Sequence, residues 1–313
     1  MDNVAKNMRF AKDYNLPINL FSDEMFGYYR TLYKDFWPTT AEQQMEREIE
    51  ECGSIDNWLV NYSKLRDKII NTIEESDEYK DFNSRNLDEY TLHNKNFQER
   101  NLYTQETDGK TFLSIDLKKA NFQALKYVGV IKDNTYEDFI KRMGGSDYFA
   151  NSKYLRQVIF GKLNPKKQIK IERYLLCKIF LTLQYPFDGF QFFSLGADEL
   201  VYEYNNDNLS PKNLLFQCES IENFIKAALG LDTTVEPVKI SRFPVIDSRG
   251  KIIDAFVRTN IITGEEKLKK VSATFYPQVY KLWKGEDINE NDRRFSYLGQ
   301  IATFDNPLQK KTR

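Results

Sequence analysis

The most constraining feature of the sequence is a pair of short β-prone runs joined by an acidic turn. Residues 190–195 and 200–204 are rich in aromatic and branched side chains, and only the segment from Gly196 to Glu199 separates them. Two such runs on either side of a short glycine-containing segment are typical of a β-hairpin. We therefore predict a tight hairpin that carries Asp198 and Glu199 in its turn.

The segments around this hairpin alternate between strand and helix patterns. They comprise, in order, a strand at 111–116, the start of a helix at 120–127, a helical insertion at about 135–163, a long helix at 166–183, the hairpin, a helix at about 219–229 and a strand near 235–243. The succession β, α, β-hairpin, α, β predicts a ferredoxin-like (βαββαβ) core that contains a helical insertion.

The residues before this core have a helical pattern. Between 22 and 77, apolar residues recur at three- and four-residue spacing, with Ser22 as the cap of a first helix. Thr40 and Gln43 form a capping-box pair for a second helix, which is expected to end at Gly53. The polar residues 78–110 are predicted to form a loop or extended arm.

A second hairpin around Thr263–Gly264, a helix near 277–283 and an irregular tail follow the core. The expected fold class is therefore α+β. We predict a helical N-terminal region at 1–110, a catalytic core at 111–245, and a C-terminal hairpin and helix at 246–313.

The composition excludes several classes of function. His93 is the single histidine, so Ser-His-Asp or Cys-His catalysis and a histidine-rich zinc site are disfavoured, and this residue is predicted to lie in a solvated loop. The three cysteines have no C-x-x-C spacing, and no stretch approaches 18 apolar residues. We expect a cytoplasmic protein without a membrane partner. The richness in Asn, Lys and Ile suggests a virus, phage or bacterium with an AT-rich genome, and a viral protein would act in the host cytoplasm.

Three acids can meet at one edge of the predicted sheet. Asp116 ends the first strand, and Asp198 and Glu199 lie in the hairpin that joins its neighbours. A carboxylate cluster without histidine suits a hard cation such as Mg²⁺, or Mn²⁺ in its place. Each of these acids can also have a purely structural role. Asp116 can cap the following helix, and the acidic turn can serve only to connect two strands.

The sequence from Ser114 to Phe122, SIDLKKANF, resembles the D-L-K-x-A-F motif of reverse transcriptases and other palm-domain polymerases. The sequence LGADELV, from Leu195 to Val201, resembles their paired-acid hairpin and also the G-G-D-E-F motif of diguanylate cyclases. The 82 positions from Asp116 to Asp198 suit a polymerase palm better than a cyclase.

This resemblance implies roles for individual residues. Asp116 and Asp198 would bind catalytic metals, with Glu199 as an auxiliary ligand or a charge that lines the site. Lys118, Asn121 and Phe122 would lie at the nucleotide. Asn121 stands where DNA polymerases and reverse transcriptases usually have an aromatic residue, and its smaller amide favours ribonucleotides.

Basic residues are concentrated between 153 and 178, a stretch that contains eight of them and a single acid, Glu172. Phosphate or nucleic-acid contact explains this bias, whereas a solvated helix face explains only the spacing. The predicted contact residues are Arg156, Lys162, Lys166, Lys167 and Lys170.

The function predicted from the sequence is a Mg²⁺-dependent nucleotidyltransferase that uses nucleoside triphosphates and a DNA or RNA template. The alternatives are a nucleotide cyclase or oligonucleotide synthetase, and a non-catalytic interaction or structural protein. The sequence does not indicate an oligomeric state.

Overall fold

The computed structural model describes residues 3–91, 97, 99–183, 190–196, 198–204 and 210–311. Within these residues, an antiparallel seven-stranded sheet has the order β2-β3-β1-β4-β5-β6, and β9 pairs with the far end of β4. The fold is therefore α+β, as predicted. The strands of this sheet are β1 (Thr111–Leu117), β2 (Phe190–Leu195), β3 (Glu199–Tyr204), β4 (Thr233–Ile246), β5 (Ile252–Asn260), β6 (Glu266–Lys269) and β9 (Gln309–Lys310).

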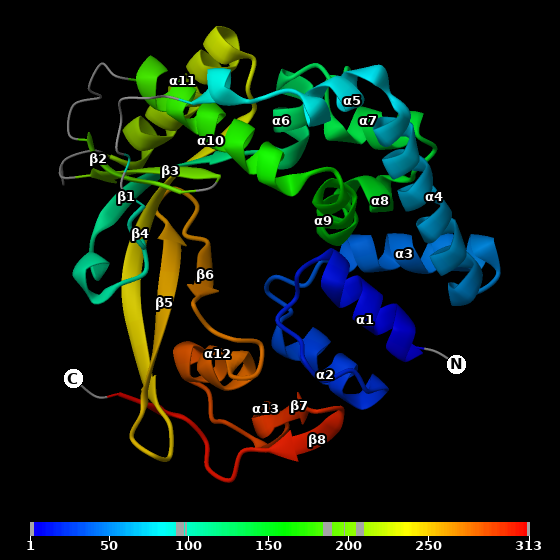
Figure 1. Cartoon of the computed structure of the whole chain (residues 1–313). Helices are drawn as coiled ribbons and strands as arrows, with labels where there is room; N and C mark the ends of the chain where they lie inside the picture. Colours follow the sequence, from blue (N-terminus) through cyan, green and yellow to red (C-terminus); the bar gives the residue numbers. More distant parts are fainter. Residues whose placement is uncertain are drawn as a thin grey trace.

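Helices cover one face of the β2-β3-β1-β4 part of this sheet (Figure 1). Leu113, Ile115 and Leu117 of β1 are buried in the main hydrophobic cluster on this side. Because side chains alternate along a strand, Ser114 and Asp116 face the opposite side. A second hydrophobic cluster that includes Phe112 covers part of this side and Ser114 is buried there, whereas Asp116 is open to solvent. The helices of this part are α6 (Ala120–Tyr127), α7 (Tyr136–Arg142), α8 (Asp147–Asn151), α9 (Lys153–Lys162), α10 (Pro165–Thr182) and α11 (Pro211–Leu229).

The N-terminal region is helical, as its periodicity predicted. Its helices are α1 (Asn3–Asp13), α2 (Asp23–Leu32), α3 (Thr39–Cys52), α4 (Ile55–Glu75) and α5 (Asp77–Ser84). Ser22 caps α2 by accepting a hydrogen bond from the Met25 N–H, and Gly53 ends α3 in a left-handed conformation.

Two local predictions in this region are wrong. Helix α3 begins at Thr39, after Pro38, without a side-chain cap, so Thr40 and Gln43 form no capping box. The arm predicted from residue 78 instead begins with α5, because Tyr79 and Phe82 lie one turn apart and both are buried. His93 lies outside the described residues.

The C-terminal part continues the sheet. Strand β4 pairs with β1 through its first half and with β5 through its second half, so the predicted boundary at 245 falls within a strand. The tail predicted to be irregular forms a further hairpin. The remaining elements are α12 (Tyr276–Lys284), α13 (Glu290–Arg293), β7 (Arg294–Tyr297) and β8 (Gln300–Thr303).

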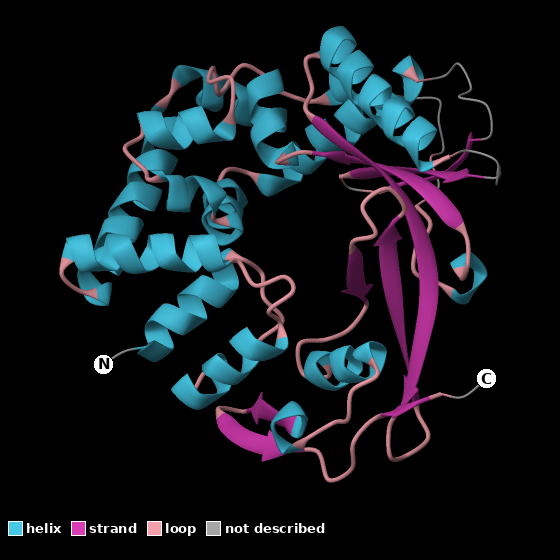
Figure 2. Ribbon diagram, turned by 180° about the vertical axis from the view of Figure 1, so that it is seen from behind, coloured by secondary structure: helices cyan, strands magenta, loops and turns pink. Residues whose placement is uncertain are grey.

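The N-terminal helices and the C-terminal segment lie side by side (Figure 2). The ring of Tyr33, which follows α2, meets Tyr276 and Tyr280 of α12 edge to face at centroid distances of 5.6 and 5.5 Å. Tyr28 also donates a hydrogen bond to the carboxylate of Asp292. No helix in the described part of the chain has the length and apolar character needed to cross a membrane.

Gly145, in the turn between α7 and α8, provides a test of the packing around this turn. A Cβ atom added there would lie 2.5 Å from Ile140 Cγ2 and 3.0 Å from Leu65 Cδ2. Because Ile140 is stiff at its branched Cβ, we expect Gly145→Ala to lower the free energy of unfolding by about 1–3 kcal/mol. Urea denaturation measures this change.

Gly161 gives the matched control, since it lies within α9 and an added Cβ there meets no atom within 4 Å. Gly161→Ala should raise the free energy of unfolding by about 0.5–1 kcal/mol through helix propensity. Equal effects of the two substitutions would contradict the close packing at Gly145.

Candidate functional site

The three acids predicted from the sequence meet at one end of the β1–β3 pair. Asp116 lies directly opposite Glu199 in the antiparallel register. The Leu117 N–H donates a hydrogen bond to the backbone carbonyl of Asp198 at 3.0 Å, and this bond fixes the hairpin turn against the end of β1. Asp116 and Asp198 are both exposed to solvent.

The electrostatic environment of Asp116 opposes its ionisation. Desolvation by the surrounding protein, followed by the charges of Asp198 and Glu199, raises the pKa of Asp116 to about 6, although its side chain remains open to solvent. Arg258 lowers this pKa only in part. Like charges gathered without a full counter-charge are typical of sites that bind a cation or perform catalysis.

A further acid lies on the helical side of the same hairpin. Glu172 of α10 is only 9% exposed. Burial, and next the charge of Asp198, raise the pKa of Glu172 from 4.5 to about 7. Glu172 was noted in the sequence only as the one acid within the basic segment, and its side chain lies within electrostatic range of the hairpin turn.

The raised pKa of Glu172 predicts a pH-dependent stability. Above pH 7 the folded protein holds an ionised buried carboxylate, whereas below pH 4.5 the residue is protonated in both the folded and unfolded states. Glu172→Gln should therefore raise the free energy of unfolding at pH 8 by about 2 kcal/mol. This gain should shrink as the pH falls from 7 to 4.5.

Urea denaturation at pH 4.5, 6 and 8 measures this dependence, with Glu219→Gln on the exposed face of α11 as the matched control. A gain for Glu172→Gln that is the same at all three pH values would contradict a carboxylate forced to ionise inside the fold.

Arg258 of β5 binds two acids, Glu199 and Glu236, next to the candidate site. Its Nη1 atom lies 2.9 Å from Glu199 Oε1, and its Nη2 atom lies 3.2 Å from Glu236 Oε2 and 3.0 Å from Ser114 Oγ. Ser114 in turn donates a hydrogen bond to Glu199. Glu199 is therefore neutralised by an arginine, while Asp116 and Asp198 have no ion pair among the described residues.

The three residues predicted to contact a nucleotide near Asp116 differ in their exposure to solvent. Lys118 is exposed and follows Asp116 by two residues. Asn121 is half-buried, and its Oδ1 atom accepts a hydrogen bond from the Phe122 N–H at 3.0 Å. Phe122 itself is 3% exposed, and its ring packs on Tyr136 and Phe139 in the core, where a nucleotide cannot reach it.

Arg156 of α9, one of the predicted basic contacts, lies within electrostatic range of Asp116. Its guanidinium carbon lies 5.8 Å from the ring centroid of Tyr136. Burial lowers the pKa of Arg156, and the charges of Tyr136, Glu137 and Asp116 oppose that change. Lys119 pairs with Glu137 beside it.

Of the other predicted contacts in the basic segment, two bind protein groups and two are exposed. Lys167 donates hydrogen bonds to the carbonyls of Phe82, Asn83 and Arg85, which lie at the C-terminal end of α5. Lys170 pairs with Asp88 at 3.6 Å, and Lys162 and Lys166 are exposed near the α9–α10 junction. The predicted contacts of the segment are thus divided between two helices, α9 and α10.

The donor chemistry of the site fits a hard cation only in part. Asp116 and Asp198 offer carboxylate oxygens without a paired cation, which suits Mg²⁺ or Mn²⁺. In the described part of the chain, no three His, Cys, Asp or Glu side chains are already gathered as a metal-binding group. Glu199 is turned toward Arg258 and Ser114. Two acids thus form the candidate metal pair, with Glu199 beside them.

The sequence reasoning missed Arg258, Glu236 and Lys269. Arg258 lies 142 positions after Asp116 and meets β1 only by reaching across β4. Burial, followed by the cations Arg258 and Lys267, lowers the pKa of Lys269 on β6. The sequence offered one signal for Arg258 and Lys269, because each strand of the second predicted hairpin carries a basic residue.

Comparison with known proteins gives no relative for this arrangement. The chain matches no protein-family model, no curated protein and no solved structure.

Proposed function

We propose that this protein is a Mg²⁺-dependent nucleotidyltransferase with a palm-type core, most simply a template-dependent polymerase. The observation that carries the proposal is the pair Asp116 and Asp198, which lies without a paired cation at the end of β1 and at the turn of the β2–β3 hairpin. The strand order β2-β3-β1-β4, with helical connections after β1 and β3, supports a ferredoxin-like palm.

Asp116 and Asp198 would hold the cation. When bound, a divalent cation lowers the pKa of an attacking 3′-hydroxyl and offsets the negative charge of the phosphates. It would also relieve the repulsion that now raises the pKa of Asp116 to about 6.

The other residues of the site would position the substrate. Arg156 and Lys118 offer positive charge beside Asp116, where a triphosphate would bind. Arg258 binds the Glu199 carboxylate and offsets part of the negative charge opposite Asp116. In the reaction, the 3′-oxygen forms a bond to the α-phosphorus, the bond to the bridging oxygen breaks, and pyrophosphate leaves.

An incubation with labelled nucleotides tests this proposal. The full chain is mixed with Mg²⁺ or Mn²⁺, labelled ribo- or deoxynucleoside triphosphates, and single-stranded templates with and without primers. Extension that follows the template supports the polymerase. A cyclic or short product formed without template would instead indicate a cyclase or oligonucleotide synthetase, and no product under any condition would contradict nucleotidyl transfer.

A further inference from the structure

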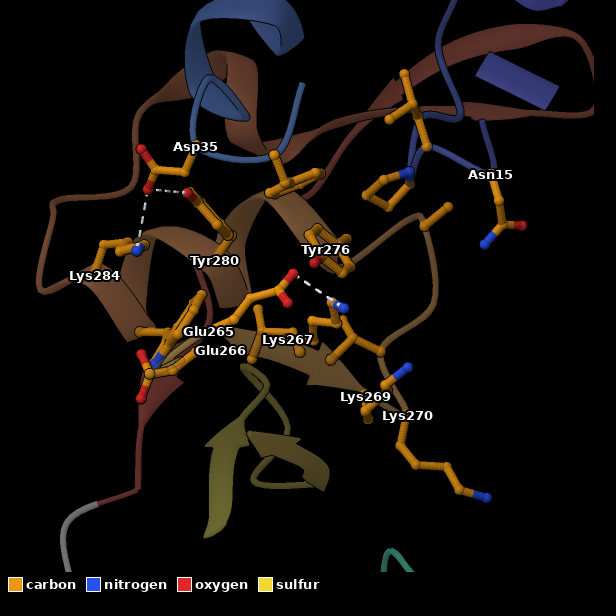
Figure 3. Close-up of a pocket in the computed structure, with 18 residues that line it drawn as sticks. Asn15, Asp35, Glu265, Glu266, Lys267, Lys269, Lys270, Tyr276, Tyr280 and Lys284 are labelled. Atoms are coloured by element: carbon orange, nitrogen blue, oxygen red, sulfur yellow. Dashed lines mark hydrogen bonds and ion pairs between the residues drawn. The ribbon is translucent and has the colours of Figure 1, made fainter. Parts of the chain in front are cut away.

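A cavity of about 780 Å³ lies between the C-terminal strand β6, helix α12 and the loops around α2 (Figure 3). It is built from segments far apart in the sequence, and the residues of the palm-like motifs do not line it. Its size falls within the range of small-molecule and nucleotide sites. Aromatic and basic side chains form much of its wall, together with the acids Asp35, Glu265 and Glu266.

The aromatic wall comes from both ends of the chain. Phe36 is 40% exposed, and its ring lies 6.4 Å from that of Tyr276 and 5.9 Å from that of Tyr280. Trp283 adds a further half-buried ring, covered on one side by Lys284 at 4.5 Å. Partly exposed rings of this kind are platforms on which nucleic-acid bases stack.

The charges in this cavity are distributed unevenly. At one side Asp35 pairs with Lys284, and Glu265 pairs with Lys267 at 3.0 Å. Lys269 and Lys270 extend from the other side (Figure 3), and neither has an ion pair in the part of the chain that the structure describes. The free positive charge is therefore concentrated at the end of β6.

Lys270 connects this cavity with the candidate active site. The same side chain lines a smaller cavity of about 290 Å³ that reaches Tyr103, Gly196 and Glu199. Arg258, Lys267 and Lys153 lie within electrostatic range of Lys269, and their positive charges lower its pKa after the effect of burial. An anion bound here would relieve this repulsion.

We propose that the cavity between β6 and α12, together with Lys269 and Lys270, binds single-stranded nucleic acid and leads it to the acids of the candidate site. This inference rests on the proposed function only in naming the strand as a substrate. A strand fits better than one nucleotide because Lys270, which directly follows β6, lines both this cavity and the smaller one at Glu199, so a ligand that runs from one to the other presents more than one phosphate. The aromatic rings then offer places for more than one base.

Fluorescence anisotropy with 5′-labelled single-stranded DNA and RNA 20-mers, and with the corresponding duplexes, tests the inference. We expect the full chain to bind a single strand more tightly than a duplex. Lys269→Gln/Lys270→Gln should weaken this binding on the order of 20-fold at 0.1 M salt and reduce the salt slope by about 1.4, as expected for two lost phosphate contacts.

The matched control is Lys64→Gln/Lys212→Gln, which removes the same charge from exposed positions on α4 and α11. It should bind as the unchanged protein does. Phe36→Ala should weaken binding about tenfold through lost stacking, whereas Phe216→Ala, on the exposed face of α11, should not. Thermal unfolding of each variant confirms that it is folded.

Unchanged binding by the Lys269/Lys270 variant, or an equal loss in the Lys64/Lys212 control, would overturn the inference. Competition by a free nucleoside triphosphate as strong as that of the oligonucleotide would also overturn it. Asp116→Asn separates the two proposals, because it should keep strand binding while losing turnover. Turnover absent from a protein that binds strands through Lys269 and Lys270 would count against the proposed function alone.

Discussion

Asp116→Asn and Asp198→Asn should each reduce Mg²⁺-dependent nucleotide incorporation by about a thousandfold. Both substitutions keep the size of the side chain but remove a charged oxygen from the candidate metal pair. Charge stabilisation at a site of this kind contributes about 10²–10³-fold per group to catalysis, and loss of the metal adds to it. Steady-state incorporation of a labelled nucleotide measures the effect.

Glu203→Gln is the matched control. Glu203 lies on β3, on the same face of the sheet as Glu199, and pairs with Lys110 at 2.8 Å, away from the hairpin turn. We expect its substitution to leave incorporation nearly unchanged. Asp116→Asn should also unfold at no lower urea concentration than the unchanged protein, because it removes like-charge repulsion. Turnover that survives in both Asn variants would contradict the assignment of these acids.

Arg258→Met should lower the free energy of unfolding by about 2–3 kcal/mol. The substitution leaves Glu199 and Glu236, which are only partly exposed, without the cation that lies 2.9 and 3.2 Å from them. Breaking a largely buried ion pair from one side costs several kcal/mol, and the partial exposure of both acids reduces that cost. Urea denaturation measures the loss.

The triple variant Arg258→Met/Glu199→Gln/Glu236→Gln distinguishes charge from packing. If the loss comes from two unpaired acids, the triple variant should recover most of the stability of the unchanged protein. A triple variant as unstable as Arg258→Met would show instead that Arg258 acts mainly through its hydrogen bond with Tyr103 and its other contacts.

The local elements of this fold could be predicted because each has its own signal. Strand β1, the β2–β3 hairpin and helix α10 follow from hydrophobic pattern, turn residues and Pro165. The meeting of Asp116 with the hairpin acids also follows, since antiparallel neighbours of β1 place their ends together. These predictions depend on short stretches of sequence or on one strand pairing.

The electrostatic partners of the site could not be predicted in the same way. Arg258 reaches Ser114 and Glu199 only because β4 pairs with both β1 and β5 in a particular register. The positions of the basic side chains could not be predicted for a related reason. The composition gives the number of charges, whereas the geometry of α9 and α10 decides where each side chain lies. Of the predicted contacts in that segment, Arg156 lies within electrostatic range of Asp116.

The most direct test of the proposed metal site is the binding of Mn²⁺ in the presence of a nucleoside triphosphate. Electron paramagnetic resonance measures this binding. The unchanged protein and Glu203→Gln should bind the cation, and Asp116→Asn and Asp198→Asn should lose most of that binding. Mn²⁺ that fails to bind the unchanged protein, or that binds both Asn variants as strongly, would contradict a metal site at Asp116 and Asp198.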